Sequence, residues 1–280
     1  MATAMHIVFS AECNALFDWH SVALFHSHQN LKQLGNMTRL LACAGDELKE
    51  YPAENMNIGP TYVHRNLRDD PLVEEKGYPS YNKPYSVHAW LSDHDIEEDY
   101  VLMMDADMVL RATIDPIALG AARGRVVSAE YTYLVGTESG FAERFISKDL
   151  IPRLAQVGGF HIFHKEDLRL IAPLWLEYTK KVRAFANKDL ETFFNESMHI
   201  PPDTPPETIV VRKRQSMWHS EMYGYAEVGV THRVRRDVML YPGYELYMGR
   251  PPAIMHYGAD YTVYGAYFNK MNHVHLMLHT

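Results

Sequence analysis

Residues 100–110, YVLMMDADMVL, constrain the fold of this chain more than any other stretch. Residues 100–104 form an apolar run without turn formers, which is typical of a short strand buried on both faces. Such strands are found in open α/β sheets, and ligands bind at the carboxyl ends of their strands. The run therefore predicts an α/β fold with a binding site directly after Met104.

Two carboxylates, Asp105 and Asp107, follow this strand and are separated by the small Ala106. In extended backbone, residues two apart point to the same side, so both carboxylates face one spot. Two like charges held together are costly unless a cation lies between them, and oxygen ligands suit Mg²⁺ or Mn²⁺. A divalent ion held there would carry a diphosphate. The competing interpretation is that Asp105 or Asp107 only caps a following turn.

The composition excludes several classes of function. The chain has 280 residues, 47% of them hydrophobic, which is enough for one large or two small domains with a buried core. A net charge of −8 without a basic tract argues against a nucleic-acid partner. No run approaches the ~20 apolar residues of a membrane span. Cys13 and Cys43, the only cysteines, cannot form a cysteine-rich zinc site and do not look like a secreted disulfide framework.

The first forty residues predict the opening of a parallel sheet. Residues 6–10 and 37–43 have the character of buried strands, and residues 14–34 predict a helix that stops at Gly35. This strand–helix–strand order places nucleotide binding at the strand ends. There is no G-x-G-x-x-G and no G-x-x-x-x-G-K, so dinucleotide and P-loop sites lose their support. Nucleotide contacts would come from loop side chains, for which the candidates are Ser10, Glu12, Thr38 and Arg39.

Two basic side chains are candidates for phosphate contacts, each with an ordinary alternative. Arg39, beside the start of a buried strand, would bind a diphosphate or else form a surface ion pair. Lys83 precedes a helix predicted at residues 85–93, and it would reach a phosphate or simply lie at a solvated helix start. Residues 51–83 are rich in turn formers and predict a long connection with one short strand at 61–64.

The second half of the chain continues the alternation of strands and helices. Strands are predicted at residues 125–129 and 157–164, the latter introduced by a glycine pair that permits close backbone approach to a ligand. Residues 166–186 have the apolar face of a long helix, which Pro173 should kink. The proline-rich residues 187–206 predict a loop, suited to a mobile lid or an acceptor-binding insertion.

Two later residues extend the candidate site. Glu221 lies in the aromatic segment MWHSEMYGY, and a buried unpaired carboxylate is costly, so Trp218 and Glu221 predict a sugar or acceptor cradle. Core packing alone would also explain the aromatics. His256 ends a strand predicted at residues 253–258, and its imidazole would complete a two-carboxylate metal site unless it is structural. Three histidines near the end form no ligand cluster and are predicted at the surface: His273, His275 and His279.

Nine stretches in family order give the chain a resemblance that covers nearly its whole length: HIVFSAEC from His6, TRLLAC from Thr38, YNKPYSVHAWL from Tyr81, YVLMMDADMVLRATIDP from Tyr100, AARGRVVSAEYTYLVG from Ala121, VGGFHIFHKEDLRLIAPLWLEYTKKVR from Val157, SEMYGY from Ser220, YPGY from Tyr241 and MHYG from Met255. On these stretches the chain resembles the peptidyl-serine α-galactosyltransferases and their relatives, the hydroxyproline arabinosyltransferases.

The resemblance implies a fold and a domain organisation. The family is similar to glycosyltransferases of the GT-A fold, in which a single Rossmann-like, mostly parallel sheet is flanked by helices. Residues 1–280 would form one catalytic domain. Within it, residues 1–110 would bind the nucleotide sugar and residues 111–280 the acceptor. Residues 187–217 fit the family pattern poorly, so acceptor specificity would reside there.

The resemblance also implies a donor, a metal and roles for particular residues. The donor would be a UDP-sugar used with Mn²⁺ or Mg²⁺. Asp105 and Asp107 correspond to the metal-and-nucleotide motif, His256 to the late metal ligand, and Glu221 to the acidic position near the acceptor. Family members carry an N-terminal signal or anchor that this sequence lacks. We expect the lumen of the ER or Golgi if the chain is part of a longer anchored protein, and the cytoplasm if it is complete.

The implied function is metal-dependent transfer of galactose from UDP-galactose to a serine of a hydroxyproline-rich peptide, with retention. In front-face attack the leaving phosphate takes the acceptor proton, whereas double displacement needs a carboxylate nucleophile, either Glu221 or Glu130. Asp107 would act by holding the metal that stabilises the leaving group. The alternatives are another UDP-sugar such as an arabinose donor, a hydroxyproline or glycan acceptor, and a non-enzymatic module that binds nucleotide sugars.

Overall fold

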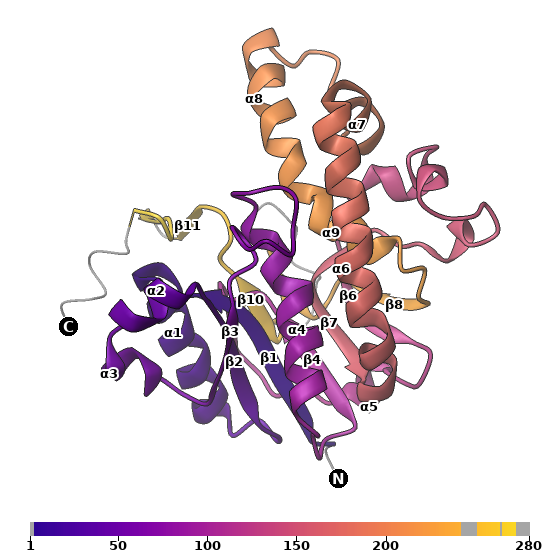
Figure 1. Cartoon of the computed structure of the whole chain (residues 1–280). Coiled ribbons are helices and arrows are strands. Elements are labelled where there is room, and N and C mark those ends of the chain that lie inside the picture. The colour runs from indigo at the N-terminus through magenta and orange to yellow at the C-terminus, as the bar shows by residue number, and fades with distance from the viewer. Residues whose placement is uncertain (1–2, 242–250, 264, 273–280) are drawn as a thin grey trace.

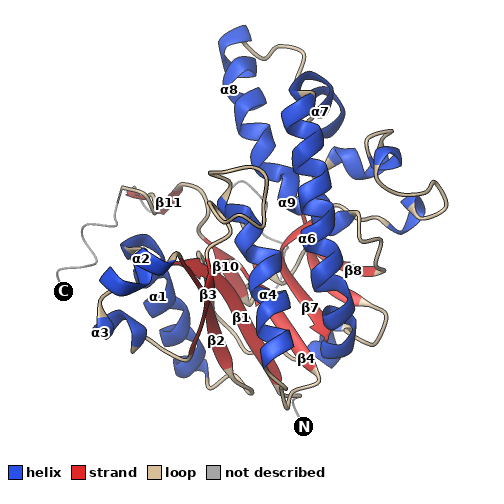
Figure 2. Cartoon of the chain, viewed as in Figure 1, coloured by secondary structure: helices blue, strands red, loops and turns tan. Residues whose placement is uncertain are grey.

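The structure is a computed structural model that describes residues 3–241, 251–263 and 265–272. Its described part contains a seven-stranded sheet in the order β3-β2-β1-β4-β7-β6-β8, with helices on both faces (Figures 1 and 2). The strands of this sheet are β1 (Met5–Glu12), β2 (Met37–Cys43), β3 (Thr61–Arg65), β4 (Tyr100–Met104), β6 (Val126–Glu130), β7 (Val157–His164) and β8 (His232–Arg235).

The direction of the strands agrees with an α/β fold. Strands β3, β2, β1 and β4 are mutually parallel, and β8 is parallel to β6. Strand β7 is antiparallel to both of its neighbours, β4 and β6. The prediction of a mostly parallel sheet flanked by helices is therefore confirmed. Because the parallel strands β1, β2 and β4 all end at one edge, that edge collects the residues which follow them.

The helices cover the two faces of the sheet. They are α1 (Ala15–Leu31), α2 (Gly45–Glu50), α3 (Ala53–Met56), α4 (Asn82–Asp93), α5 (Pro116–Leu119), α6 (Lys165–Lys188), α7 (Leu190–Ser197), α8 (Pro206–Ser216) and α9 (Ser220–Ala226). Strand β1 alternates between two cores: Ile7 and Phe9 pack with α1 on one face, and Val8 packs with α4 and α6 on the other. Both faces of β1 are therefore covered by helices.

Several strands have the bounds that the sequence predicts, and the first helix ends earlier than expected. Helix α1 stops at Leu31 with Lys32 as a left-handed cap, rather than at Gly35. Gly35 instead lies in the turn before β2, with φ of 101°. A Cβ at this position would lie 2.2 Å from the carbonyl oxygen of Met5, so the turn requires glycine.

The predicted loop at residues 187–206 is wrong in its first half, which forms helix α7. Asp189 caps this helix by accepting a hydrogen bond from the Thr192 amide at 3.0 Å, and Phe193 and Phe194 are buried. The cap and the apolar pair outweigh the prolines, which lie only at the far end of the segment. Helices α7 and α8 stand beyond the edge at which the central strands end (Figure 1).

Smaller strands complete the structure. Strand β10 (Ile254–His256) pairs with β5 (Met108–Leu110) and with β9 (Met239–Leu240), and β11 (Tyr261–Val263) pairs with β12 (Ala266–Phe268). Within the described ranges, no helix has the length and apolar character that crossing a membrane requires. The three histidines predicted at the surface, His273, His275 and His279, lie outside the described residues.

Cys13 and Cys43 form a disulfide, which corrects the expectation drawn from their number. Cys13 follows β1 directly and Cys43 ends β2, and their Cα atoms are 5.3 Å apart. The two strands are parallel neighbours. The residues at their carboxyl ends therefore meet at the same edge of the sheet, although they lie far apart in sequence. The count of two cysteines carries no information about this proximity, which arises only from the strand pairing.

Candidate active site

Three side chains that could hold a metal ion meet at the carboxyl end of β4. They are Asp105, Asp107 and His256, and one ligand atom from each lies within 4.8 Å of the others. Strand β10 pairs antiparallel with β5 and places His256 opposite Met108, so the pairing brings the imidazole beside Asp107. Two carboxylates and one imidazole form an oxygen-rich donor set that fits Mn²⁺ or Mg²⁺. The three residues predicted as metal ligands are thus neighbours in space.

Hydrogen bonds orient the imidazole of His256. Its Nε2 lies 3.1 Å from Oδ1 of Asp107, and its Nδ1 lies 3.2 Å from the hydroxyl oxygen of Tyr131. A bound metal would replace the proton on Nε2, and Nδ1 would then carry the ring proton and donate it to Tyr131. Tyr131 therefore positions His256, a role that the sequence did not indicate.

The glycine pair of β7 makes room for Tyr131. A Cβ on Gly158 would lie 2.1 Å from a ring carbon of Tyr131, and one on Gly159 would lie 2.8 Å from its hydroxyl oxygen. The pair was predicted to allow close approach to a ligand. The structure corrects this, because the backbone approaches a buried tyrosine that in turn contacts His256.

Two lysines neutralise the carboxylates. Lys83 Nζ lies 2.6 Å from Oδ1 of Asp105, and Lys270 forms an ion pair with Asp107. Burial opposes ionisation of Asp107, yet His256 and Lys270 outweigh it and hold the pKa of this carboxyl well below its usual range. Burial likewise disfavours the charged form of Lys83, but the facing carboxylates, Asp105 above all, raise its pKa. Each aspartate of the site is therefore paired with one lysine.

These residues line a cavity of about 710 Å³. The cavity lies where β1 and β4 end, and it takes side chains from both halves of the chain. Such a volume is in the range of pockets that hold small organic ligands. Its polar lining includes Ser10, Glu12, His20, Asn82, Lys83, Asp105, Asp107, Tyr131, His219, Glu221, His256 and Lys270.

Two of the four predicted nucleotide-binding side chains line this cavity. Ser10 shares a hydrogen bond with Ser86 at 2.9 Å. Glu12 accepts hydrogen bonds from Asn82 at 2.9 Å and from Arg68 at 3.2 Å. Glu12 is thus held by partners inside the protein.

Thr38 and Arg39 lie away from the cavity, which corrects their prediction as nucleotide contacts. Both are in the amino-terminal half of β2, at the end of the sheet opposite to the binding edge. Thr38 bonds to the imidazole of His6 at 2.9 Å. Arg39 is fully buried and forms an ion pair with Asp18 at 3.4 Å, so it is neither a surface ion pair nor a phosphate ligand. The direction of the strand determines which of its residues lie near the cavity, and the apolar pattern does not reveal that direction.

Glu221 lies in the first turn of α9 and faces the cavity. It is 5% exposed, and burial raises the pKa of its carboxyl to about 6, with Lys83 opposing that rise and Asp105 adding to it. Its backbone amide donates to the Tyr78 hydroxyl at 3.0 Å, and its carbonyl accepts from the Trp175 indole at 3.3 Å. The backbone of Glu221 is therefore anchored while the carboxylate remains at the cavity.

The other candidate nucleophile, Glu130, is placed differently. It ends β6 and forms an ion pair with Arg236, and it is absent from the cavity lining in the described part of the chain. Trp218, predicted as part of the cradle, does line the cavity and is 53% exposed. The structure thus brings Glu221 and Trp218 to the site and leaves Glu130 outside it.

Besides Tyr131, the sequence analysis missed three further residues of the cavity. Asn82 bonds Glu12 from the start of α4, inside the family-like stretch that already contained Lys83. Lys270 pairs with Asp107 but lies in a region without a recognisable pattern. The imidazole of His20 is 2% exposed, and neither ring nitrogen has a hydrogen-bond partner among the described residues. In the sequence, His20 looks like one more position of an apolar helix.

Comparison with known proteins shows the family. Residues 5–200 match the model of the hydroxyproline O-arabinosyltransferase family N-terminal domain. The chain belongs to this hydroxyproline O-arabinosyltransferase family. A peptidyl serine alpha-galactosyltransferase of Arabidopsis thaliana is 37% identical over 96% of the chain, and one of Chlamydomonas reinhardtii is 33% identical over 91%. The hydroxyproline O-arabinosyltransferase PLENTY of Lotus japonicus is 27% identical over 93%.

The alignments to these relatives cover a larger share of this chain than of the relatives' own length. The chain spans 31% and 34% of the length of the two galactosyltransferases, and 66% of the arabinosyltransferase. Among solved structures, the galactosyltransferase LgtC in complex with donor and acceptor sugar analogs matches with a TM-score of 0.50 at 12% identity. This match covers 91% of the chain and 87% of LgtC. The likeness shows that this family member has the GT-A fold.

Proposed function

We propose that this chain is a metal-dependent, retaining glycosyltransferase that uses a UDP-sugar, namely UDP-galactose. The proposed acceptor is a serine hydroxyl in a hydroxyproline-rich peptide. The observation that carries the proposal is the meeting of Asp105, Asp107 and His256 at the wall of a cavity which Glu221 also lines. The family membership and the two relatives named as peptidyl serine alpha-galactosyltransferases support the choice of sugar and acceptor.

The residues at the end of β4 suit a leaving diphosphate. When bound by Asp105, Asp107 and His256, a divalent ion would supply Lewis-acid stabilisation of the charge on the leaving phosphate. Lys83 and Lys270 already lie beside these carboxylates. The site can therefore present further positive charge to the oxygens of the leaving phosphate. Tyr131 holds the His256 ring in the required orientation. The metal ion and the two lysines would thus place positive charge beside the diphosphate of a UDP-sugar.

Glu221 is the carboxylate best placed to act on the sugar or the acceptor. It is buried, it lines the cavity and its backbone is fixed by Tyr78 and Trp175. In a front-face reaction it would orient the acceptor or stabilise positive charge on the sugar, while the leaving phosphate takes the proton. In a double displacement it would be the nucleophile. The position of Glu130 outside the cavity lining makes Glu221 the stronger candidate for either role.

A second candidate function keeps the same site with a different donor and acceptor. The family model that matches residues 5–200 is named for transfer of arabinose to hydroxyproline, which favours an arabinose donor. The higher identity to the serine galactosyltransferases, 37% against 27%, favours galactose. A module that binds nucleotide sugars without turnover would also retain the fold, but it would not require a buried Glu221 beside the metal ligands.

We also propose an oxidising compartment, the lumen of the ER or Golgi, as the place of action. The disulfide between Cys13 and Cys43 supports this, because such bonds persist in oxidising compartments and are rare in the cytosol.

Release of UDP, measured with and without Mn²⁺ over a panel of UDP-sugars, tests the proposal. With a hydroxyproline-rich peptide containing serine, we expect Mn²⁺-dependent release from UDP-galactose and galactose linked to serine in the product. Preference for an arabinose donor with product on hydroxyproline would establish the second function. Mn²⁺-dependent UDP binding without turnover of any donor would identify a binding module.

A further inference from the structure

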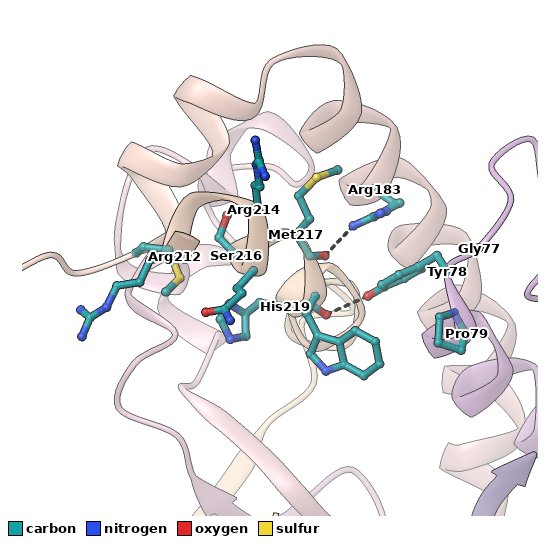
Figure 3. Close-up of a pocket in the computed structure, with 12 residues that line it drawn as sticks. Gly77, Tyr78, Pro79, Arg183, Arg212, Arg214, Ser216, Met217 and His219 are labelled. Atoms are coloured by element: carbon teal, nitrogen blue, oxygen red, sulfur yellow. Dashed lines mark hydrogen bonds between the residues drawn. The ribbon is translucent and has the colours of Figure 1, made fainter. Parts of the chain in front are cut away.

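A second cavity of about 630 Å³ adjoins the active-site cavity. It lies between the end of α8 with the turn that follows it, and the loop before α4 (Figure 3). Four side chains line both cavities: Pro79, Met198, Trp218 and His219. We call this second cavity the outer groove. A chain that leaves the active site past Trp218 would enter it directly.

The inner wall of the outer groove is held rigidly. The hydroxyl of Tyr78 donates to the Trp218 carbonyl at 2.8 Å, and it accepts from the amide of Glu221 at 3.0 Å. Arg183 stacks 4.2 Å from the Tyr78 ring centroid and donates to the Met217 carbonyl at 2.8 Å. Figure 3 shows both bonds reaching the turn that contains Met217. The groove is therefore linked through one tyrosine to the position of Glu221.

Trp218 presents a large apolar surface between the two cavities. Its side chain is 53% exposed although its backbone is fixed, an arrangement that costs little entropy when a ligand stacks on the ring. Pro79 and Met198 add apolar surface to both cavities. Aromatic-lined grooves are one of the recurring sites that bind extended, proline-rich peptides.

The outer rim of the groove is basic and unpaired. Arg212 and Arg214 line the groove, and both side chains are exposed and lack an ion-pair partner among the described residues. Lys213, between them, is instead paired with Glu191. Figure 3 places Arg212 and Arg214 on the side of the groove opposite Tyr78 and Pro79. In a chain of net charge −8, two free arginines at one groove favour an anionic ligand.

We infer that the outer groove binds the stretch of acceptor peptide beside the reacting serine and selects acidic side chains there. The peptide would lie extended across Trp218, with its carboxylates facing Arg212 and Arg214 and its serine in the active-site cavity. This inference rests on the proposed function for the nature of the acceptor. It adds a sequence preference, which neither the family membership nor the metal site supplies.

Direct binding of peptide probes tests the inference separately from turnover. The probes are fluorescein-labelled peptides with one serine between prolines, and with aspartate, asparagine or lysine at two positions on each side. Anisotropy in the presence of Mn²⁺ and UDP gives their Kd values. We expect the aspartate peptide to bind about 10-fold more tightly than the asparagine peptide, with a preference that weakens in high salt. The lysine peptide should bind most weakly.

Matched variants assign the preference to the groove. Arg212→Gln with Arg214→Gln should abolish the preference for aspartate. Arg111→Gln with Arg153→Gln, which removes two exposed arginines elsewhere, should preserve it. Trp218→Ala should weaken the aspartate and asparagine peptides equally. Affinity for UDP with Mn²⁺ should stay unchanged in both arginine double variants.

Several results would overturn the inference. Equal affinities of the aspartate and asparagine peptides would do so, as would an equal loss in both arginine double variants. No binding of any peptide at about 1 mM would do so as well, and so would displacement of the aspartate peptide by a neutral oligosaccharide but not by unlabelled peptide. Failure of the proposed function would appear differently, as absent Mn²⁺-dependent UDP binding or absent turnover with peptide binding retained.

Discussion

His256 Nε2 lies 3.1 Å from Asp107 Oδ1, although 149 residues separate the two in sequence. The contact is built by backbone pairing, since His256 stands opposite Met108, the residue after Asp107, in the β5–β10 ladder. The Tyr257 amide also donates to the Asp107 carbonyl at 3.0 Å and closes the pair. Sheet geometry therefore fixes the distance between a carboxylate and an imidazole before any ion is present.

The first prediction concerns Asp107. Asp107→Asn keeps the shape of the side chain but removes the charge that a divalent ion requires, so Mn²⁺-dependent UDP affinity should fall by about 10-fold or more. Titration of UDP binding with Mn²⁺ measures this, with thermal unfolding to show that the fold is intact. Asp46→Asn, at an exposed carboxylate whose ion pair in the described part of the chain is with Lys49, should behave as the parent protein. Unchanged UDP affinity in Asp107→Asn would remove Asp107 from the metal site.

The second prediction separates His256 from the residue that orients it. His256→Ala should raise the Mn²⁺ concentration needed for half-maximal turnover and reduce turnover by about 10-fold or more. Tyr131→Phe keeps the ring that fills the space beside Gly158 but removes the hydroxyl bonded to Nδ1. It should raise the Mn²⁺ requirement less, and excess Mn²⁺ should restore turnover. Normal metal dependence in His256→Ala would mean that this histidine is structural.

The local part of the site was readable from the sequence. An apolar run of five residues followed by Asp105 and Asp107 specifies a buried strand with two carboxylates after it. The expectation that both carboxylates continue the extended backbone is wrong, because Ala106 and Asp107 lie in the turn between β4 and β5. The candidacy of His256 as a metal ligand came from the end of an apolar strand and from resemblance. Its pairing with β5 depends on a long-range ladder that no local pattern encodes.

The failures share one physical cause. Arg39 sits in a correctly predicted strand but at its amino-terminal end, and periodicity does not tell which end of a strand meets a ligand. Cys13 and Cys43 pair because β1 and β2 are neighbours. Lys270 reaches Asp107 from a segment without periodicity. Each depends on tertiary contact between distant segments, whereas strand existence depends on local composition.

The third prediction concerns Glu221. Glu221→Gln preserves volume and should leave UDP and Mn²⁺ binding unchanged, while transfer falls by orders of magnitude because the charge acts mainly in the transition state. Slow hydrolysis of the donor should persist, since water needs no acceptor site. Single-turnover transfer and thermal unfolding on the same preparation measure both properties. A destabilised variant with full turnover would assign Glu221 a structural role only.

The same carboxylate sets a pH dependence. Burial raises its pKa to about 6, so the charged form is lost as pH falls through that value. If the ionised form is required, kcat/KM should decline below about pH 6 in the parent protein. The decline should be absent from the residual activity of Glu221→Gln. An identical profile in both proteins would attribute the decline to another group.

The fourth prediction concerns the disulfide between Cys13 and Cys43. The cross-link closes a loop across a sequence separation of 30, for which chain entropy predicts a stabilisation of about 3 to 4 kcal/mol. The double variant Cys13→Ala and Cys43→Ala should lower the Tm, and a reducing agent should lower the Tm of the parent protein but not of the variant. Equal response of both proteins to the reducing agent would show that the cross-link is absent in solution.

The last prediction concerns Glu227, a carboxyl outside the active site. It is 1% exposed, neither oxygen has a hydrogen-bond partner among the described residues, and burial raises its pKa from 4.5 to about 8. Between these values the folded protein keeps a proton that the unfolded chain releases. The contribution of Glu227 to stability is therefore fully present below pH 4.5 and is lost as pH rises through about 8.

Glu227→Gln keeps the neutral shape at every pH and should remove this loss. We expect it to raise the Tm by about 2 °C or more at about pH 9 and to change it little at about pH 4. The matched control is Glu138→Gln, because Glu138 is exposed, and it should shift the Tm equally little at both values. If Glu227→Gln lowers the Tm by the same amount at both pH values, the carboxylate has a partner in solution. Its burial would then carry no cost that depends on ionisation, and the folded protein would bind no extra proton there.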